Sequence, residues 1–423
     1  MTDTEGQSQK PSSVDDNATQ ALDHSQWLVR IGFLLCAAYA AWHLYVLNIA
    51  PLETWTFRIL HIAGALILGF GMSAALSVRP IPETTPPKVA VVLGGVALVA
   101  TIVALGSLSA AVITMEPGAQ APPEWTLLFF GWTLAGGTLL AVLTGWLYPA
   151  RVGQVPLSDI ALIVATVVSC GFILFSLDTL SLRLRAGTPF ADGNNGWAAF
   201  VIVVLIAELT RRLAGMALVV IAVIFIAYAF LGPWMPGFLE HRGYEAKRFF
   251  TYIFTDNGVL GPTTAVSSTY IILFIVFAAF LQSSKVGDYF VNFAFAAAGR
   301  ARGGPAKVSV LASGLMGMIN GTSAGNVVST GSLTIPLMKK VGYRPQSAGA
   351  IEAAASTGGQ IMPPIMGAGA FIMAEITGIP YTELVVAALI PAILYFASIY
   401  FMVDFEASRT GMRGMRKDEL PKL

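Results

Sequence analysis

The feature that most constrains this chain is a succession of uncharged apolar runs, each long enough to cross a lipid bilayer. A membrane-spanning helix needs roughly 20 apolar residues. Only 12% of the residues are charged, about half the fraction of an ordinary soluble domain. The first runs of this kind are Trp27 to Leu47, Phe57 to Val78, Val89 to Ile113, Trp125 to Tyr148 and Leu157 to Leu177. The sequence therefore predicts an all-α integral membrane protein, a multi-spanning helical bundle in the lipid bilayer.

A short apolar run, Trp197 to Leu209, is followed directly by Leu213 to Leu231. The residues between them include Arg211 and Arg212, which predict a tight basic turn, and the neighbouring Glu208 is expected to form a structural ion pair with them. Further spans are predicted at Thr263 to Leu281 and Leu384 to Val403, and an amphipathic connecting helix at Val286 to Ala298.

Changes in composition predict four parts. Residues 1–24 are polar and are expected to form a disordered cytoplasmic tail, and residues 25–232 form a helical support region. Residues 233–262 form a polar connecting loop, and residues 263–423 a second membrane domain. With a cytoplasmic N-terminus, alternation of the spans places Arg58, Arg183 and Arg185 outside, against the positive-inside rule.

One uncharged segment, Val308 to Met338, does not resemble a lipid-facing helix. Its middle, NGTSAGNVVSTGS, is almost entirely small or polar. Basic residues flank both of its ends, so both ends are predicted to lie in the cytoplasm. These residues are Arg300, Arg302, Lys307, Lys339, Lys340 and Arg344. The segment is therefore predicted to be a re-entrant hairpin with its tip near Thr322 to Asn326, because non-helical backbone at that depth is tolerated only inside protein or beside a wet cavity.

The next apolar segment, Ser347 to Ile376, is interrupted by STGGQIMPP from Ser356 to Pro364. Proline removes a backbone donor and glycine loosens a helix, so a helix broken at an unwound centre is expected. A hairpin followed by a broken helix is typical of a midplane binding site in secondary transporters. The alternative interpretation is that the small residues only allow helices to pack closely.

The candidate site consists of small and oxygen-bearing residues from both interruptions. Sodium prefers hard oxygen ligands, which unwound carbonyls and Ser, Thr or Asn side chains supply, while the positive ends of half-helices can face a carboxylate. We therefore expect sodium as the coupling ion and no other cofactor. The hairpin candidates are Asn320, Gly321, Thr322, Ser323, Gly325, Asn326, Ser329 and Thr330. The broken-helix candidates are Ser356, Thr357, Gly358, Gly359, Gln360, Pro363 and Pro364.

Glu352 lies in an otherwise uncharged stretch, where an ionisable group is costly and by default functional. It is also close enough to Arg344 to be a solvated or ion-paired structural acid, and the sequence leaves both interpretations open.

Residues Gly321 to Gly325 also spell GxSxG, the nucleophile elbow of hydrolases. An intramembrane hydrolase would need Ser323 with a histidine, for which His43 and His61 are conceivable partners; the other histidines are His24 and His241. Nothing else in the sequence supports an enzyme, and the two membrane histidines are better explained by helix packing.

Several long motifs resemble one family. They are ARGGPAKVSVLASGLMG, NVVSTGSLTIPLMKKVGY and IEAAASTGGQIMPPIMGAGAFIMAEITGIPY, with AELTRRLAG and VLGPTTAVSSTYIILFIVFAAFLQ upstream. They are similar to the DctM-like large membrane domain of tripartite ATP-independent periplasmic (TRAP) transporters, and more narrowly to fused four-helix plus twelve-helix permeases of the TAXI type. The resemblance runs from about Val155 to the C-terminus.

This resemblance implies a sodium-driven elevator in the cell inner membrane. A periplasmic TAXI-type solute-binding protein would deliver an organic anion such as a carboxylate. It also implies that Asn320 to Asn326 and Ser356 to Pro364 enclose one sodium site. A net charge of +1 gives no reason to expect a nucleic-acid partner.

The sequence departs from this family in two ways. Gly325 stands where the family more usually has another small residue, and no second, inverted hairpin and break follows. Half of the expected substrate site is therefore missing from this sequence. The alternatives are a fragment, a truncated or non-transporting subunit or scaffold, and one half of a transporter whose second half is separately encoded.

Overall fold

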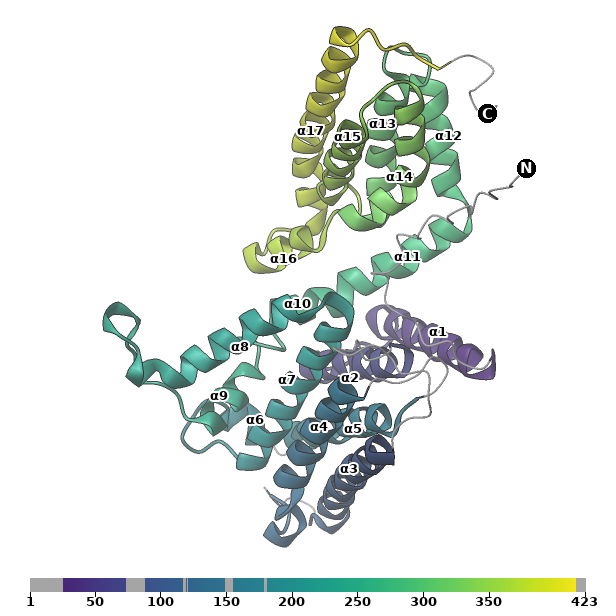
Figure 1. Ribbon diagram of the computed structural model, residues 1–423. Coiled ribbons are helices and arrows are strands. Elements are labelled where there is room, and N and C mark those ends of the chain that lie inside the picture. The colour runs from purple at the N-terminus through teal and green to yellow at the C-terminus, as the bar shows by residue number, and fades with distance from the viewer. Residues whose placement is uncertain are drawn as a thin grey trace, which may run out of the picture. The chain divides into compact units, whose positions relative to one another are not determined.

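The computed structural model describes residues 26–73, 88–116, 119, 121–148, 155–178 and 181–415. All regular elements of these residues are helices, as the sequence predicts (Figure 1). Eight helices in the described part are long and apolar enough to cross a membrane. The predicted tail at 1–24 lies outside the described residues. The chain divides into two compact units. The first consists of the chain up to Ala41 together with Leu52–Gly261, and the second consists of Trp42–Pro51 together with Pro262–Leu423.

The first unit is a helical bundle with its core between the long helices. Its elements, beginning with a helix shared with the second unit, are α1 (Gln26–Asn48), α2 (Thr54–Met72), α3 (Lys88–Thr114), η2 (Glu124–Leu127), α4 (Phe130–Leu147), α5 (Leu157–Asp178), α6 (Ser181–Arg185), α7 (Gly193–Ala214), α8 (Met216–Leu231), η3 (Gly232–Trp234), η4 (Gly237–Leu239) and α9 (Ala246–Ile253). Phe130, Leu134, Ile173 and Ile202 are fully buried where α4, α5 and α7 pack together. Between membrane-spanning helices such packing contributes through van der Waals contacts, because lipid tails are as apolar as these side chains.

Helix α7 is longer than the predicted run from Trp197 to Leu209. It begins at Gly193, where the Asp192 carboxylate caps the helix by accepting a hydrogen bond from the Asn194 amide at 3.2 Å. It continues through both arginines to Ala214. The turn into α8 is therefore Gly215 alone, with φ +83°, a conformation that glycine adopts without strain. The arginines stay helical because buried acids pair with them.

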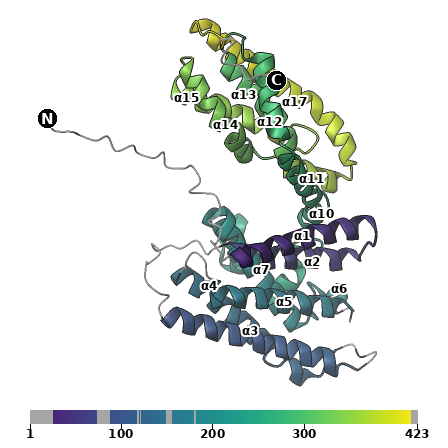
Figure 2. The same ribbon diagram turned by 90° about the vertical axis from the view of Figure 1, so that its right-hand side faces the viewer.

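The second unit contains the interrupted helices. Its elements are α10 (Pro262–Val266), the π-helical turn η5 (Ser267–Ile271), α11 (Ile272–Ser283), α12 (Val286–Ala298), α13 (Gly304–Asn320), α14 (Ser323–Lys340), α15 (Pro345–Thr357), η6 (Gly358–Gln360), α16 (Ala368–Thr377) and α17 (Tyr381–Arg409). Helices α13, α14 and α15 pack against one another (Figure 2). The predicted helical hairpin and broken helix are both confirmed.

The base of the hairpin is fixed by an ion-paired cluster. Asp404 on α17 accepts hydrogen bonds from Lys307 at 2.6 Å and Arg302 at 3.0 Å. Two of the basic residues that predict the hairpin therefore also tie α13 to α17.

An aromatic stack holds the far side of the break. Tyr270, Phe274, Phe371 and Tyr381 lie with ring centroids 4.5–5.9 Å apart. The Tyr381 hydroxyl also contacts the carbonyl of the second proline and that of the next residue. It donates to Pro364 O at 2.6 Å and lies 2.9 Å from Ile365 O. The stack thus positions the chain that leaves the break.

Candidate functional site

The hairpin turn is tighter than the predicted tip. Helix α13 ends at Asn320, Gly321 adopts φ +58°, and α14 begins at Ser323. The Thr322 hydroxyl caps α14 by accepting a hydrogen bond from the Gly325 amide at 3.2 Å. Only Gly321 and Thr322 lie outside the two helices, so Ser323 to Asn326 form the first turn of α14.

The break is wider on its C-terminal side than the motif suggests. Ser356 and Thr357 still belong to α15, and the α-helix resumes only at Ala368. Between them Met366 adopts φ +54°, which is uncommon for a residue with a side chain. The Gly367 amide donates to Gln360 O at 2.7 Å and closes the loop. Pro363 and Pro364 lie inside this loop and contribute no amide donors.

The hairpin and the break touch through their backbones. A methyl group added at Gly317 would lie 2.4 Å from the Gly359 Cα atom. One added at Gly321 would lie 2.1 Å from the Met366 carbonyl oxygen. Real side-chain atoms do not approach so closely, so these positions require glycine. The structure thus brings the two predicted interruptions into direct contact.

Asn326 is the polar side chain at this contact. It is fully buried, and its amide nitrogen donates to the Ser313 carbonyl at 2.8 Å. Its Oδ1 atom is buried and accepts no hydrogen bond. It lies beside Gly359, because a methyl group at Gly359 would be 2.9 Å from the Asn326 amide nitrogen. Buried acceptors without a donor are rare in proteins, and a bound cation is one way to satisfy such an oxygen.

Glu352 is also fully buried, and it is neither solvated nor ion-paired among the described residues. Five hydroxyl groups from three helices surround its carboxylate. Ser309 donates to Oε2 at 2.6 Å, and Ser313 and Ser356 donate to Oε1 at 3.1 Å each. Thr330 donates to Oε1 and Thr334 to Oε2. The interpretation of Glu352 as a solvated or ion-paired acid near the interface is therefore wrong.

The remaining candidate residues divide by exposure. The buried ones are Gly321, Asn326, Thr330, Ser356, Gly358, Gly359 and Pro363. Those of intermediate exposure are Asn320, Ser323 and Gly325, and the exposed ones are Thr322, Ser329, Thr357, Gln360 and Pro364. Asn320 donates to the exposed Ser329 hydroxyl at 3.4 Å, on the outside of the turn. Of the buried subset, Thr330 and Ser356 donate to Glu352, and Gly359 lies beside Asn326.

Sequence reasoning missed Ser309, Ser313 and Thr334 as members of this cluster. A signal was present, because each of the three helices carries a hydroxyl-bearing or acidic pair at i and i+4. These pairs are Ser309 and Ser313, Thr330 and Thr334, and Glu352 and Ser356. Residues four apart lie on one face of a helix, so three such faces can meet in one polar cluster.

The backbone around Ser323 does not have the structure of a nucleophile elbow. The elbow requires a strand, a sharp turn and a helix, whereas Ser323 follows a helix-to-helix turn. His61 instead bonds Tyr39, with 2.9 Å between Nδ1 and the phenol oxygen. His241 likewise lies 3.1 Å from the Tyr228 carbonyl.

The first unit also contains buried acidic side chains, and these are paired with arginines. Arg211 bonds Glu208 at 2.8 Å, which confirms the predicted ion pair. Arg212 bonds both Glu208 at 2.8 Å and Asp159 at 2.6 Å. Trp146 donates to Glu208 at 2.8 Å. Two acids and two arginines balance one another, so this cluster is structural.

Acids pair with two of the cations on the predicted outer side. Arg58 bonds Asp256 at 3.2 Å, and Arg183 bonds Glu53 at 2.6 Å. Partial burial would raise the pKa of Glu53. Hydrogen bonds from the Thr56 and Trp55 amides, from Arg183 and from the Thr56 hydroxyl nevertheless lower it to about 2. Both of these cations therefore have an acidic partner in the first unit.

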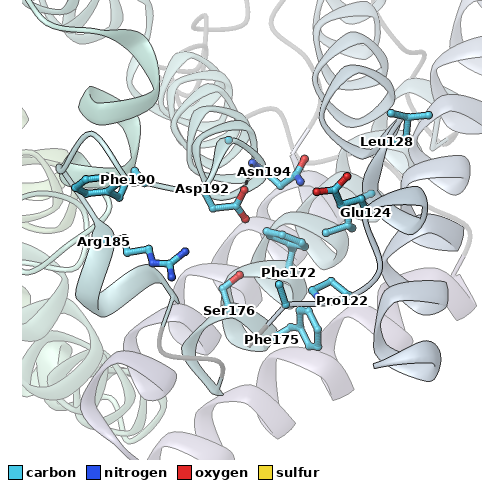
Figure 3. Close-up of a pocket in the computed structure, with 14 residues that line it drawn as sticks. Pro122, Glu124, Leu128, Phe172, Phe175, Ser176, Arg185, Phe190, Asp192 and Asn194 are labelled. Atoms are coloured by element: carbon cyan, nitrogen blue, oxygen red, sulfur yellow. Dashed lines mark hydrogen bonds between the residues drawn. The ribbon is translucent and has the colours of Figure 1, made fainter. Parts of the chain in front are cut away.

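The third exception, Arg185, lines a half-open cavity of about 590 Å³ in the first unit (Figure 3). Glu124, Asp192 and Asn194 face the same cavity, and Phe172 lies among its lining residues. The lining thus presents charges of both signs above an aromatic surface.

Helices long enough to span a membrane, with a hairpin packed against a broken helix, define a multi-pass membrane transport protein. Residues 201–423, just over half of the chain, match the family described as the tripartite ATP-independent periplasmic transporter, DctM component. The chain belongs to this family of TRAP permeases, whose members are inner-membrane proteins.

Individual relatives match over shorter stretches. The large permease protein DctM of the C4-dicarboxylate TRAP transporter of Pseudomonas aeruginosa is 34% identical over 122 residues, 29% of this chain and 28% of that protein. The protein of the same name from Vibrio cholerae is 35% identical over 91 residues, 22% of this chain and 20% of that protein. The uncharacterized protein y4mL of Sinorhizobium fredii is 29% identical over 138 residues, 33% of this chain and 32% of that protein. The chain thus spans about a third or less of these relatives.

Proposed function

We propose that this chain is the membrane permease component of a sodium-coupled, binding-protein-dependent transporter that imports small organic anions such as carboxylates. The observation that carries the proposal is the fully buried Asn326 Oδ1 atom, which accepts no hydrogen bond at the contact between the hairpin and the break. An oxygen in this situation is satisfied by a cation without any change in the surrounding hydrogen bonds.

The chemistry of the contact fits sodium. Sodium takes neutral oxygen ligands in a compact arrangement, and carbonyls released from helices supply them. Asn326 would hold the ion with backbone carbonyls of the unwound break. Gly317 and Gly359 allow the backbones to approach closely enough for such an arrangement. The described residues offer no group of three or more His, Cys, Asp or Glu side chains, the set that a transition metal prefers.

The substrate class and partners rest on relatives and on sequence motifs. Two of the relatives are named as C4-dicarboxylate permeases. The motifs resemble TAXI-type fused permeases, so a TAXI-type periplasmic binding protein is the proposed partner. A second half of the transport domain, with a hairpin and a break of its own, is a further proposed partner.

The first experiment measures sodium binding by the purified chain in detergent. The melting temperature is followed as NaCl replaces choline chloride at constant ionic strength. We expect a sodium-specific rise, since a ligand at 100 times its Kd stabilises by about 2.7 kcal/mol. Asn326→Ala should abolish the rise, and Asn292→Ala, an exposed asparagine of the same unit, should retain it. A native chain without a sodium-specific rise would contradict the sodium site.

The second experiment measures uptake of a dicarboxylate into proteoliposomes with the binding protein, with and without the product encoded immediately downstream. Sodium-dependent uptake that needs the downstream product supports a split transporter. Normal assembly without uptake in either case supports the alternative, a non-transporting membrane subunit.

A further inference from the structure

Glu352 poses a problem that the proposed sodium site by itself does not solve. Its carboxylate is fully buried and accepts five hydroxyl hydrogen bonds, yet no ion pair among the described residues includes it. Hydroxyl groups satisfy its lone pairs but do not neutralise a charge. A buried charge without a partner is strongly destabilising, and ionisable residues within membrane segments are by default functional.

The hydroxyl groups connect this carboxylate to Asn326. The Ser313 hydroxyl donates to Glu352 Oε1, while the Ser313 backbone carbonyl accepts the Asn326 amide at 2.8 Å. The Thr330 hydroxyl gives its one proton to Oε1 and lies 2.9 Å from the Asn326 backbone carbonyl one helical turn earlier. Ser313 is thus the residue that connects the carboxylate to the Asn326 side chain. Ser309 and Thr334 donate to Oε2, and neither is hydrogen-bonded to Asn326 in the described part of the chain.

Helix α14 packs closely against the Glu352 side chain. A methyl group at Gly331 would lie 3.0 Å from the Glu352 Cγ atom, so α14 lies directly against the carboxylate side chain. Three helices, α13, α14 and α15, supply the five hydroxyls. The carboxylate is therefore fixed relative to both the hairpin and the first half of the broken helix.

We propose that Glu352 is the positioning residue of the cation site: its carboxylate holds Asn326 in place through Ser313 and supplies the negative charge that balances the bound ion. This proposal rests on the proposed sodium site. The ligands of that site are neutral oxygens, so the charge of the cation needs a partner nearby. Attraction between opposite charges is strong where water is excluded, and residues behind the ligands typically change metal affinity about 10–100-fold.

The decisive variant is Glu352→Gln, which keeps the shape of the side chain and removes the charge. The sodium midpoint is measured from the melting temperature of the full chain in detergent, with choline as the control cation. We expect the midpoint to rise at least about tenfold. Glu352→Asp keeps the charge and should recover part of the affinity. Glu383→Gln, an exposed glutamate of the same unit, should leave the midpoint unchanged.

A purely structural role predicts a different result. Glu352→Gln would then lower the melting temperature equally with and without sodium, and an unchanged midpoint would overturn the proposal. If the native chain itself shows no sodium-specific stabilisation, the proposed sodium site fails first. The two failures are thus distinguishable.

A second pair of variants keeps the test decisive if Glu352→Gln does not fold. Ser313→Ala and Ser309→Ala each remove one hydroxyl from the carboxylate. Of the two residues, Ser313 also accepts a hydrogen bond from the Asn326 side chain through its backbone carbonyl, so Ser313→Ala separates the carboxylate from the residue that holds Asn326. We expect Ser313→Ala to raise the sodium midpoint clearly more than Ser309→Ala. Equal midpoints for the two variants would contradict the connection to Asn326.

Discussion

Two buried glutamates, one in each unit, have opposite surroundings. Glu208 in the first unit is 2% exposed and contacts two arginines. Glu352 in the second unit is 0% exposed, and its carboxylate accepts hydrogen bonds from five hydroxyl groups. Both carboxylates have hydrogen-bond partners, but within the described part of the chain Glu208 has cationic partners and Glu352 has none. The paired charge of Glu208 suits a structural role, whereas the unpaired charge of Glu352 favours binding of a cation nearby.

The candidate site of the second unit is made of interrupted helices, although the same unit also contains the unbroken 29-residue helix α17. In the first unit α3 and α5 run unbroken for 27 and 22 residues, as a supporting bundle requires. In the second unit α13 turns back after 17 residues and α15 stops after 13. Interrupted helices leave backbone groups free to bind. Charge balance and helix continuity thus point to the same division of labour between the units.

The largest expected effect comes from removing a cation of the balanced cluster. Arg212→Met deletes the group that, among the described residues, bonds both Glu208 and Asp159, and so leaves buried acids short of a partner. We expect a loss of stability of about 3–5 kcal/mol, measured by denaturant or thermal unfolding in detergent. The sodium midpoint of the remaining folded protein should not change, since the candidate site lies entirely in the second unit.

Arg242→Met is the matched control, because Arg242 is exposed. If both arginine variants destabilise the chain equally, the buried cluster does not stabilise the first unit. The structural role assigned to Glu208 would then be wrong.

The next effect is expected where the hairpin meets the break. Gly317→Ala places a methyl group 2.4 Å from the Gly359 Cα atom, and neither backbone can move aside without separating the two elements. Overpacking of this kind costs about 1–3 kcal/mol. We expect this loss in thermal unfolding, together with a weaker response to sodium.

Gly349→Ala is the control on α15. A methyl group there meets nothing within 4 Å, and alanine is favoured over glycine inside a helix by up to about 1 kcal/mol. This variant should therefore be as stable as the native chain or more stable. A Gly317→Ala chain that matched it in both stability and sodium response would show that the backbone contact is not needed.

The architecture could be predicted from sequence because each interruption has a local cause. The basic residues around Val308 to Met338 indicate a hairpin, and Gly358, Gly359, Pro363 and Pro364 break the following helix by their own backbone properties. The connecting helix at Val286 to Ala298 is also present at the predicted bounds. These features depend on neighbours in the sequence alone.

The interior of the site could not be predicted in the same way. Whether Glu352 is buried depends on α13 and α14 covering it, and that packing is a tertiary property. Its position near Arg344 left a functional and a solvated or ion-paired acid equally open, because sequence distance from a basic residue says little about depth inside a helix cluster. Which candidates are buried, such as Asn326 and Thr330, likewise depends on which helix faces meet.

The smallest expected effect concerns an exposed ion pair, which sharpens the contrast with the buried cluster. Glu53 caps α2 by accepting hydrogen bonds from the Trp55 and Thr56 amides at 3.1 and 2.8 Å, and it bonds the partly exposed Arg183. Glu53→Gln keeps an oxygen acceptor for the cap and removes the charge, so it should cost about 0.2–1 kcal/mol, the usual range for an exposed ion pair, well below the loss expected for Arg212→Met. Thermal unfolding at pH 7 measures the difference.

The stability difference between the native chain and Glu53→Gln should depend on pH. The pKa of Glu53 is lowered to about 2 in the folded chain, below an unfolded value of about 4.3. Its contribution is therefore fully present above the unfolded value and is lost as the pH falls toward 2. The stability difference between the native chain and Glu53→Gln should shrink between pH 5 and pH 3, whereas Glu240→Gln, an exposed loop variant, should show no such trend. A difference that stayed constant over this range would mean that the cap acts through shape and not through charge.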